Sequence, residues 1–474
     1  MPFVFYDTET TGTEASYDQI LQFAAIRTDD SLKVTDRFEI RCRLQPHIVP
    51  SPGALVVTDM TIGQLTDPAL PSHYEMVRAI RAKLLSWSPA VFAGYNSLDF
   101  DEILVRQALY QTLHPPYLTN TNGNSRADIL MQVLALNEFV PEVLNFHMRP
   151  DGKPSFKLDL LAPANGFEHQ NAHDAFGDVE ATVHIAGLIR SRAPALWDHM
   201  IKLGGKNAAV AYALAEPLRL HTEFHYNRPH HWIMSPIAVD PSYSGHVVSF
   251  DLAVDSDEVR VLDEESLAKR ISTFPKPLRV MKTNACPIIL PWTRGEGITQ
   301  AFELGEAELR RRADIVQTDE GFRQRLLKVH GQVKKEYEPS PYIEGQIYDG
   351  FPSSADQRLM DEFHTLPWQA RFGLATAFED QRLRQLARRL AYFEYPQAMD
   401  EATKAEFDQA IARRLLTTEK VPWTTLPKAI DETNSLLETA GGADADRLGE
   451  LMDYLKVRLS EAGRIAGDSA YDRF

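Results

Sequence analysis

The sequence predicts three parts in order: an α/β domain, a small β-barrel and a C-terminal all-α domain. The early part of the chain alternates short apolar runs with amphipathic stretches, as strands and helices packed in layers do. Short β-like runs interrupted by Pro and Gly follow, and from then on the apolar residues recur at helical spacing. A chain of 474 residues is also too long for one core. We therefore expect domains at 1–193, 194–346 and 347–474.

The first element is a run that begins at Phe3 and ends in an acidic pair before Gly12. Its valine and aromatic residues are typical of a buried strand. Because successive side chains of a strand alternate between faces, Asp7 and Glu9 should point to the same side. Two such carboxylates repel each other unless a cation lies between them, so they are candidate ligands for Mg²⁺ or Mn²⁺. An ordinary strand followed by an acidic turn is the alternative.

The next elements place a third carboxylate. Residues 20–27 and 38–44 predict two more strands, and short polar turns between them favour an antiparallel meander. Residues 74–87 predict a helix, and 90–96 predict a buried strand that leads into another helix. Asp101 lies at this junction, where an open α/β sheet places ligand groups, although Asp is also a common helix N-cap.

The last candidate segment is 171–181, which begins a helix that continues to about residue 192. His173 and Asp178 are five positions apart, which is roughly 140° around a helix. Both can reach one site only if His173 lies before the helix or in its first turn. A surface pair is the alternative.

Together these segments supply four carboxylates and one histidine: Asp7, Glu9, Asp101, Asp178 and His173. Several carboxylates are needed to hold two divalent cations roughly 4 Å apart. A histidine can take a proton from water near neutral pH. The combination indicates hydrolysis of a phosphodiester, in which His173 would deprotonate the attacking water.

The composition narrows the class of protein. It is 44% hydrophobic and 24% charged, as in ordinary globular proteins. The sequence has no apolar run of about 18 residues, so we expect no membrane span, and the N-terminus shows no export signal. Two cysteines, Cys42 and Cys286, favour a cytoplasmic location. The net charge of −16 argues against a broad coat on DNA but not against a local basic groove.

Three motifs follow one another in the first 190 residues: Asp7-x-Glu9-Thr10-x-Gly12, Asn96 with Phe100-Asp101, and His173-x-Ala175-x-x-Asp178. As a set they resemble the DEDDh 3′→5′ exonucleases, and no motif residue departs from the pattern. The resemblance implies a ribonuclease H-like domain in which the four carboxylates bind metal, Glu9 also contacts substrate and the histidine is the base.

The chain resembles the bacterial exodeoxyribonuclease I family still more closely, and over nearly its whole length. The stretches that carry this likeness are 22–28, 94–96, 124–128, 154–158, 164–169, 284–287 and 348–351. The resemblance implies a mixed sheet flanked by helices, an SH3-like barrel with a helical insertion over 305–333, and a C-terminal helical domain. It implies processive, single-strand-specific 3′→5′ hydrolysis of DNA to 5′-mononucleotides in DNA repair or recombination. The implied cofactor is two Mg²⁺ ions, with Mn²⁺ as a substitute.

The same resemblance assigns contacts and partners. Lys157 lies where the family has a substrate-binding basic residue, although Lys replaces the expected Arg and loses its bidentate fork. The implied DNA-contact residues, each ordinary surface without the resemblance, are Arg106, Tyr117, Lys206, Arg279 and Asn284. We expect a monomer that binds single-stranded DNA and the acidic tail of single-strand-binding protein, and no membrane.

Two clusters of arginines can be explained without a role in DNA binding. Arginines 310–312 follow Glu306 and Glu308, which predicts a solvated helix face with internal pairing. A second cluster predicts a solvated face, or helices that close the other domains into a ring around the strand; its members are Arg382, Arg384, Arg388 and Arg389.

Two other functions stay open. An RNA 3′-trimming enzyme would use the same catalytic domain, although short RNA trimmers lack the long stretch after it. The second alternative is a scaffold that binds single strands without cleaving them. Such a protein would need neither a complete set of metal ligands nor a catalytic base, so the presence of both argues against it.

Overall fold

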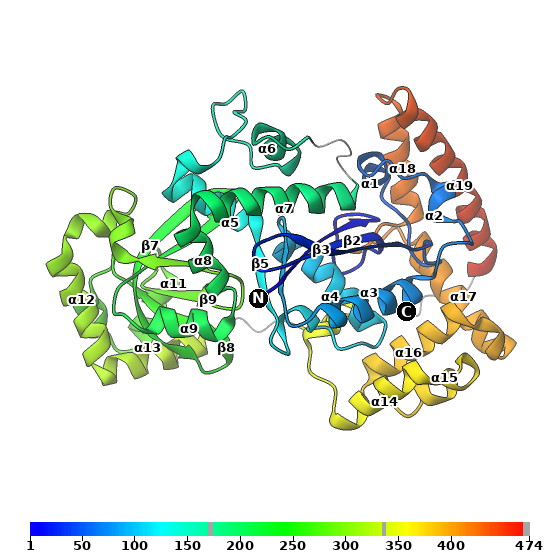
Figure 1. Cartoon of the computed structure of the whole chain (residues 1–474). Coiled ribbons are helices and arrows are strands. Elements are labelled where there is room, and N and C mark those ends of the chain that lie inside the picture. Colours follow the sequence, from blue (N-terminus) through cyan, green and yellow to red (C-terminus); the bar gives the residue numbers. More distant parts are fainter. Residues whose placement is uncertain (169–173, 334–337, 468–474) are drawn as a thin grey trace.

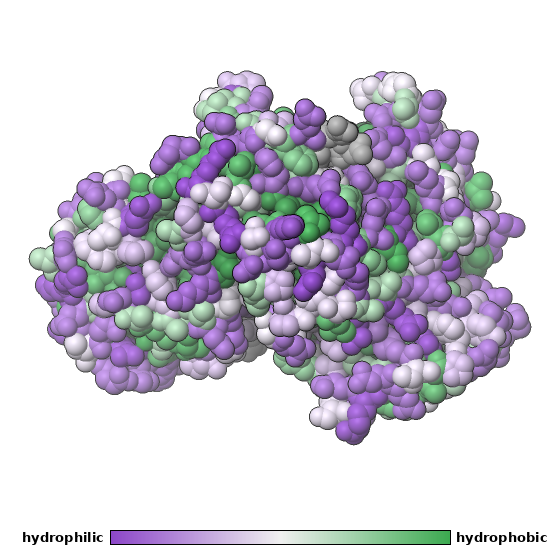
Figure 2. Space-filling view, viewed as in Figure 1, coloured by the Kyte–Doolittle hydropathy of each residue, from purple (hydrophilic) through white to green (hydrophobic). Residues whose placement is uncertain are grey.

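The computed structural model describes residues 1–168, 174–333 and 338–467 (Figure 1). A mixed sheet lies in the middle of the molecule. A second sheet with its own helices lies on one side, and the C-terminal helices lie on the other. Hydrophilic residues cover most of the face that Figure 2 shows. Within the described ranges, no helix is both long enough and apolar enough to cross a membrane.

The middle sheet has the strand order β3-β2-β1-β4-β5. Its central strand, β1 (Phe3–Thr10), pairs antiparallel with β2 (Ile20–Thr28), which pairs antiparallel with β3 (Val34–Arg41). On the other side β1 pairs in parallel with β4 (Val91–Gly94), which pairs in parallel with β5 (Ser125–Asp128). The predicted antiparallel meander is confirmed, and the sheet as a whole is mixed.

Side chains of β1 alternate between two cores. Phe3 and Phe5 pack with α5 (Ile129–Phe139) and α7 (Ala175–Arg192). The even positions of the strand pack on the opposite face, with α3 (His73–Trp87) and α4 (Asp101–Gln111). Because this alternation continues along the strand, the odd positions that follow Phe5 face the side of α7.

The second sheet is antiparallel throughout, in the order β10-β6-β7-β8-β9. Its strands are β6 (Arg219–His225), β7 (Arg228–Asp240), β8 (Tyr243–Asp251), β9 (Leu278–Lys282) and β10 (Ile288–Pro291). The helices predicted over 305–333 are confirmed as α12 and α13, but among the described residues they follow the last strand, β10, and α10 and α11 are the helices between strands. The helices of this part are α8 (Pro194–Leu203), α9 (Lys206–Leu214), α10 (Ser256–Arg260), α11 (Glu264–Ser272), α12 (Glu306–Thr318) and α13 (Glu320–Gln332).

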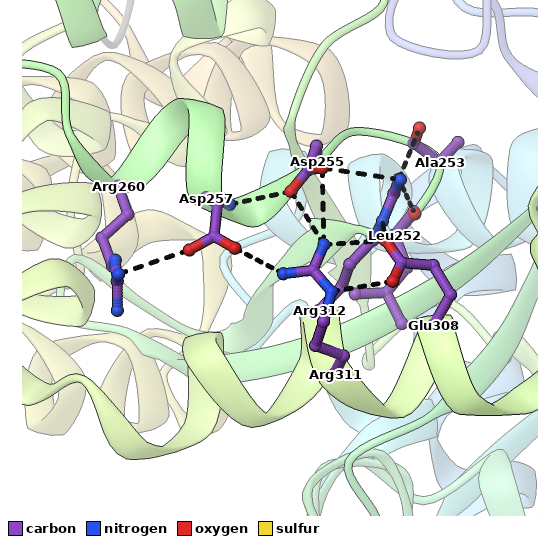
Figure 3. A network of polar contacts seen from close by, with 8 residues as sticks. All are labelled: Leu252, Ala253, Asp255, Asp257, Arg260, Glu308, Arg311 and Arg312. Carbon is purple, nitrogen blue, oxygen red and sulfur yellow. Dashed lines mark hydrogen bonds and ion pairs between the residues drawn. The ribbon is translucent and has the colours of Figure 1, made fainter.

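The predicted pairing of the arginines in α12 is confirmed and extends beyond that helix. Glu308 accepts hydrogen bonds from Arg311 and Arg312, each at 2.7 Å (Figure 3). Arg311 also pairs with Asp255 and Asp257, at the start of α10. The arginines therefore hold two helices together, and this explains the cluster without a ligand.

The C-terminal helices pack against the middle sheet's domain. Apolar residues of the last three helices share one core with α1 (Pro52–Val57) and α2 (Ile62–Leu65). The helices are α14 (Ser354–Thr365), α15 (Trp368–Ala375), α16 (Gln381–Glu394), α17 (Glu401–Leu416), α18 (Leu426–Leu437) and α19 (Ala443–Ala466).

A buried ion network strengthens this contact. Glu344 pairs with Arg389 of α16 at 2.7 Å and with Arg414 of α17 at 3.4 Å, and Arg389 also donates to Gln111 of α4. The predicted solvated face is therefore wrong for Arg389, which is only 5% exposed. Burial alone would raise the pKa of Glu344, but Arg414 and Arg389 outweigh it and lower the pKa to about 2.

Candidate active site

Three acidic side chains meet at the end of β1. Asp7 and Glu9 come from alternate positions of the strand, and Asp178 comes from the first turn of α7. One carboxylate oxygen of each residue lies within 4.8 Å of those of the other two. The structure thus brings together three of the four predicted metal ligands, because the strand's alternation directs them towards α7.

Burial and mutual repulsion both raise the pKa values of two of these carboxylates, Asp7 and Glu9. Burial, followed by repulsion from Asp178 and Asp101, raises the pKa of Glu9 to about 8. Burial and the same two neighbours also raise the pKa of Asp7 well above its ordinary value. A divalent cation would offset this repulsion, and carboxylate oxygens are the ligands that Mg²⁺ and Mn²⁺ prefer. The residues present therefore fit a divalent metal.

Asp101, the fourth predicted ligand, lies beside this group. It begins α4, and the Thr8 hydroxyl donates a hydrogen bond to its carboxylate at 2.6 Å. Burial raises the pKa of Asp101 to about 7. After burial, repulsion from Asp101 is the next largest cause that raises the pKa of Asp7. Its role as a ligand stays a prediction.

His173, the predicted base, lies outside the described residues. The described chain resumes at Asp174, and α7 begins one residue later, so the position of His173 relative to the helix stays a prediction. Asp174 accepts a hydrogen bond from Gln22 on β2 at 2.7 Å and pairs with Arg41 on β3 at 3.1 Å. The chain is therefore anchored to the sheet directly after His173.

Asp128 is a residue whose importance the sequence argument missed. Its carboxylate accepts hydrogen bonds from the backbone N–H groups of Asn96 at 3.0 Å and Leu98 at 3.1 Å, and it caps α5. These bonds fix the turn after β4, where Asn96 has a φ of 61°. Because this turn leads into Asp101, Asp128 helps to place the predicted ligand. An Asp between a strand and a helix is an N-cap signal that could have found it.

Glu102 is a second such residue, and nothing in its sequence context distinguishes it from an ordinary helix residue. Only 2% of its surface is exposed, at the start of α4. It joins β1, which carries Asp7 and Glu9, to α4, which carries Asp101, and to β5. Its carboxylate accepts hydrogen bonds from Tyr6 at 2.9 Å, Thr119 at 2.6 Å, Arg106 at 2.9 Å and Arg126 at 3.1 Å.

We expect Glu102→Gln to lower the rate of hydrolysis about 10- to 100-fold, as loss of a partner that orients metal ligands commonly does. The amide keeps the shape of the side chain, but it removes the charge and turns N–H groups towards existing donors. The measurement is kcat alongside the melting temperature, with the exposed Glu306→Gln as control. A folded Glu102→Gln variant with unchanged kcat would contradict this positioning role.

The structure places Arg106 and Tyr117, two predicted DNA contacts, together. The Arg106 guanidinium lies 5.1 Å from the centre of the Tyr117 ring. Arg106 also pairs with Glu102 and donates to the Tyr348 hydroxyl at 3.1 Å. These partners hold its side chain, which is 13% exposed, in a fixed position.

Lys206 and Asn284, two further predicted contacts, both lie against the first residues of β8. Lys206 donates to Ser244 at 3.2 Å. The Asn284 side chain lies against Gly245, where a Cβ would come within 2.9 Å of it. Arg126 links Asn284 to Glu102, because it donates both to the Glu102 carboxylate and to the backbone carbonyl of Asn284.

Arg279, the remaining predicted DNA contact, lies on β9. It pairs with Asp251 at 2.9 Å, and its guanidinium lies 4.0 Å from the centre of the Trp232 ring. An acidic partner therefore already compensates the charge of Arg279.

A cleft of about 1320 Å³ opens beside the carboxylates. Both sheet domains contribute to its walls: Asp178 and Lys157 come from the first, and the turn between β6 and β7 comes from the second. Lys157, the predicted substrate residue, directly precedes α6 (Leu158–Ala164). The cleft thus joins a predicted metal ligand and a predicted phosphate contact in one space.

Comparisons with known proteins agree with this architecture. The family model described as Exonuclease matches residues 4–186, which contain the carboxylate group. The model described as Exonuclease I C-terminal domain matches residues 342–458, which contain most of the C-terminal helices. The two matches lie on either side of the second sheet.

Similar proteins span almost the whole chain. Exodeoxyribonuclease I of Escherichia coli K12 is 28% identical over 421 residues, covering 84% of this chain and 87% of that protein. Its counterpart from Haemophilus influenzae is 28% identical over 452 residues, covering 87% and 93%.

Solved structures give the same result. E. coli exonuclease I in complex with a dA16 oligonucleotide has a TM-score of 0.81 at 25% identity, covering 96% of this chain and 99% of that one. The moderately thermophilic exonuclease I from Methylocaldum szegediense has a TM-score of 0.81 at 27% identity, covering 97% and 99%. The likeness covers the first sheet, the second sheet and the C-terminal helices together, so this chain is similar to exodeoxyribonuclease I throughout its fold.

Proposed function

We propose that this chain is a single-strand-specific 3′→5′ exodeoxyribonuclease that depends on a divalent metal and releases 5′-mononucleotides. The observation that carries the proposal is the group of three carboxylates, Asp7, Glu9 and Asp178, beside a cleft that two domains form. The similar exodeoxyribonucleases and the oligonucleotide complexes of E. coli exonuclease I support DNA as the substrate.

In this proposal the carboxylates of Asp7, Glu9, Asp101 and Asp178 hold two Mg²⁺ ions, for which Mn²⁺ can substitute. A zinc-bound form of the E. coli exonuclease I complex with single-stranded DNA supports a divalent metal in this family. When bound, such metals stabilise the negative charge that develops on the scissile phosphate and the leaving oxygen. Glu9 also contacts the terminal nucleotide, and Lys157 attracts a phosphate as a point charge.

His173 is the proposed base that takes a proton from the attacking water. We expect His173→Ala to lower kcat roughly 10²–10⁴-fold, the usual contribution of general acid–base catalysis. Affinity for single-stranded DNA, measured in EDTA, should not change, because the role concerns the water and not the strand. Partial rescue of the variant by added imidazole would support this role, and an unchanged kcat would remove His173 as the base.

The decisive experiment compares 5′-labelled single-stranded DNA, duplex DNA and single-stranded RNA, each with Mg²⁺ and with EDTA. We expect a ladder that shortens from the 3′ end on single-stranded DNA only, and only with metal. A preference for RNA would leave the proposed hydrolysis mechanism intact, but it would show that the substrate is the 3′ end of RNA and not of DNA. Binding without cleavage of any substrate would favour the scaffold function instead.

The remaining details of the proposal concern architecture and partners. We place domain boundaries near residues 193 and 346, and we propose that the second sheet forms an SH3-like barrel. Exonuclease I has been solved together with SSB and with SSB-Ct, which supports the same partner for this chain. The predicted DNA contacts, the monomeric state, processive action and a cytoplasmic role in DNA repair stay predictions.

A further inference from the structure

The turn between β6 and β7 has an unusual composition. His225 and Arg228 pair across it, so the turn consists of two residues, Tyr226 and Asn227. Tyr226 is completely exposed, and its ring therefore gains nothing from packing in the core. A large aromatic side chain at the tip of a hairpin is not needed for folding.

The backbone of this turn is also unfavourable for tyrosine. Tyr226 has a φ of 51° and Asn227 a φ of 58°, so both residues adopt the left-handed conformation of a tight hairpin turn. Asparagine tolerates this conformation, whereas bulky residues rarely adopt it. Tyr226 thus lowers stability without a compensating contact inside the protein, and strained positions of this kind are concentrated at binding and catalytic sites.

The location of the turn suggests what the ring binds. Tyr226, Asn227 and Arg228 line the same cleft as Asp178 and Lys157. Arg149 and Lys153 also line the cleft, although both pair with Asp151. Cations that follow the phosphates, combined with an exposed aromatic ring for the bases, are typical of surfaces that bind single strands.

We propose that Tyr226 stacks on a nucleobase of the strand whose 3′ end lies near Asp178. The inference rests on the proposed function and identifies a specific contact for it. Every base offers a flat face, so this contact would be independent of sequence. Because the hairpin belongs to the second domain and Asp178 to the first, the stack would hold the strand across both domains while nucleotides are removed.

Three variants test this inference by affinity for a fluorescent oligothymidylate in EDTA. Tyr226→Asn should bind roughly 5- to 100-fold more weakly, the range expected for loss of one base–aromatic stack. Its melting temperature should equal or exceed that of the wild type, because asparagine suits the left-handed turn. Tyr226→Trp keeps a stacking ring and should bind like the wild type. Val261→Asn changes another highly exposed side chain of the same domain and should leave affinity unchanged.

A series of oligonucleotides with one abasic site, moved stepwise from the 3′ end, locates the stacked base. The wild type should lose affinity at one position, and Tyr226→Asn should be insensitive there. Equal affinities for the wild type and Tyr226→Asn, or the same abasic profile for both, would overturn the inference while leaving the proposed function intact. A wild type that neither binds nor degrades single-stranded DNA would overturn both.

Discussion

Asp7→Ala should abolish hydrolysis while the protein stays folded and still binds single-stranded DNA. Asp7 is the central member of a group whose carboxylates repel one another, and its loss removes a ligand for the cation that this group fits. Metals contribute several kcal/mol of transition-state stabilisation, so the expected fall in kcat is more than about 10³-fold. The measurement is single-turnover cleavage of a 5′-labelled oligonucleotide.

A second measurement separates lost metal binding from misfolding. Adding Mn²⁺ should raise the melting temperature of the wild type, because a ligand that binds only the native state stabilises it. Asp7→Ala should lose this shift. In EDTA it should be at least as stable as the wild type, since one buried repelling carboxylate is gone. Asp36→Asn, which changes an exposed aspartate of β3, is the control and should keep the shift. A normal shift in Asp7→Ala would contradict its role as a ligand.

Glu344→Gln should destabilise the protein by about 3–5 kcal/mol, the usual cost of removing one partner from a buried ion pair. Arg389 and Arg414 are each 5% exposed and would keep their charges without the carboxylate that compensates them. Urea unfolding followed by fluorescence measures the effect. The control is Glu306→Gln, which breaks an exposed pair with Arg310 and should cost less than about 1 kcal/mol. An equal decrease in the free energy of unfolding in both variants would contradict the claim that the Glu344 pair matters more because it is buried.

Acid unfolding gives an independent check on Glu344. Its pKa is about 2 in the folded protein, below the ordinary value of 4.5. A lowered pKa means that the charged form stabilises the fold, so this contribution is complete above pH 4.5. It should be lost as the pH falls from 4.5 to 2. Glu344→Gln lacks this titration, so its stability should depend less steeply on pH in that window.

Much of the fold follows from local patterns. The alternation along β1 predicted that Asp7 and Glu9 share a face, and the structure confirms it with Asp178 in the same group. The helix at 74–87 is confirmed as α3, which a capping box from Ser72 begins. By contrast, β5 has only four residues, and so short a segment shows no clear alternation of apolar and polar residues. It is a strand because it pairs with β4, which a local pattern does not reveal.

The sequence by itself determined the order of the catalytic motifs, the strand face that carries the first two carboxylates and the helix that carries the last. These depend on periodicity over a few residues, and a sequence displays periodicity directly. Only the tertiary structure decided that Glu102 joins three elements, that Arg389 is buried and that Tyr226 lies in the cleft of Asp178. These features depend on contacts between residues far apart in the chain, and no local pattern distinguishes a buried partner from an exposed one.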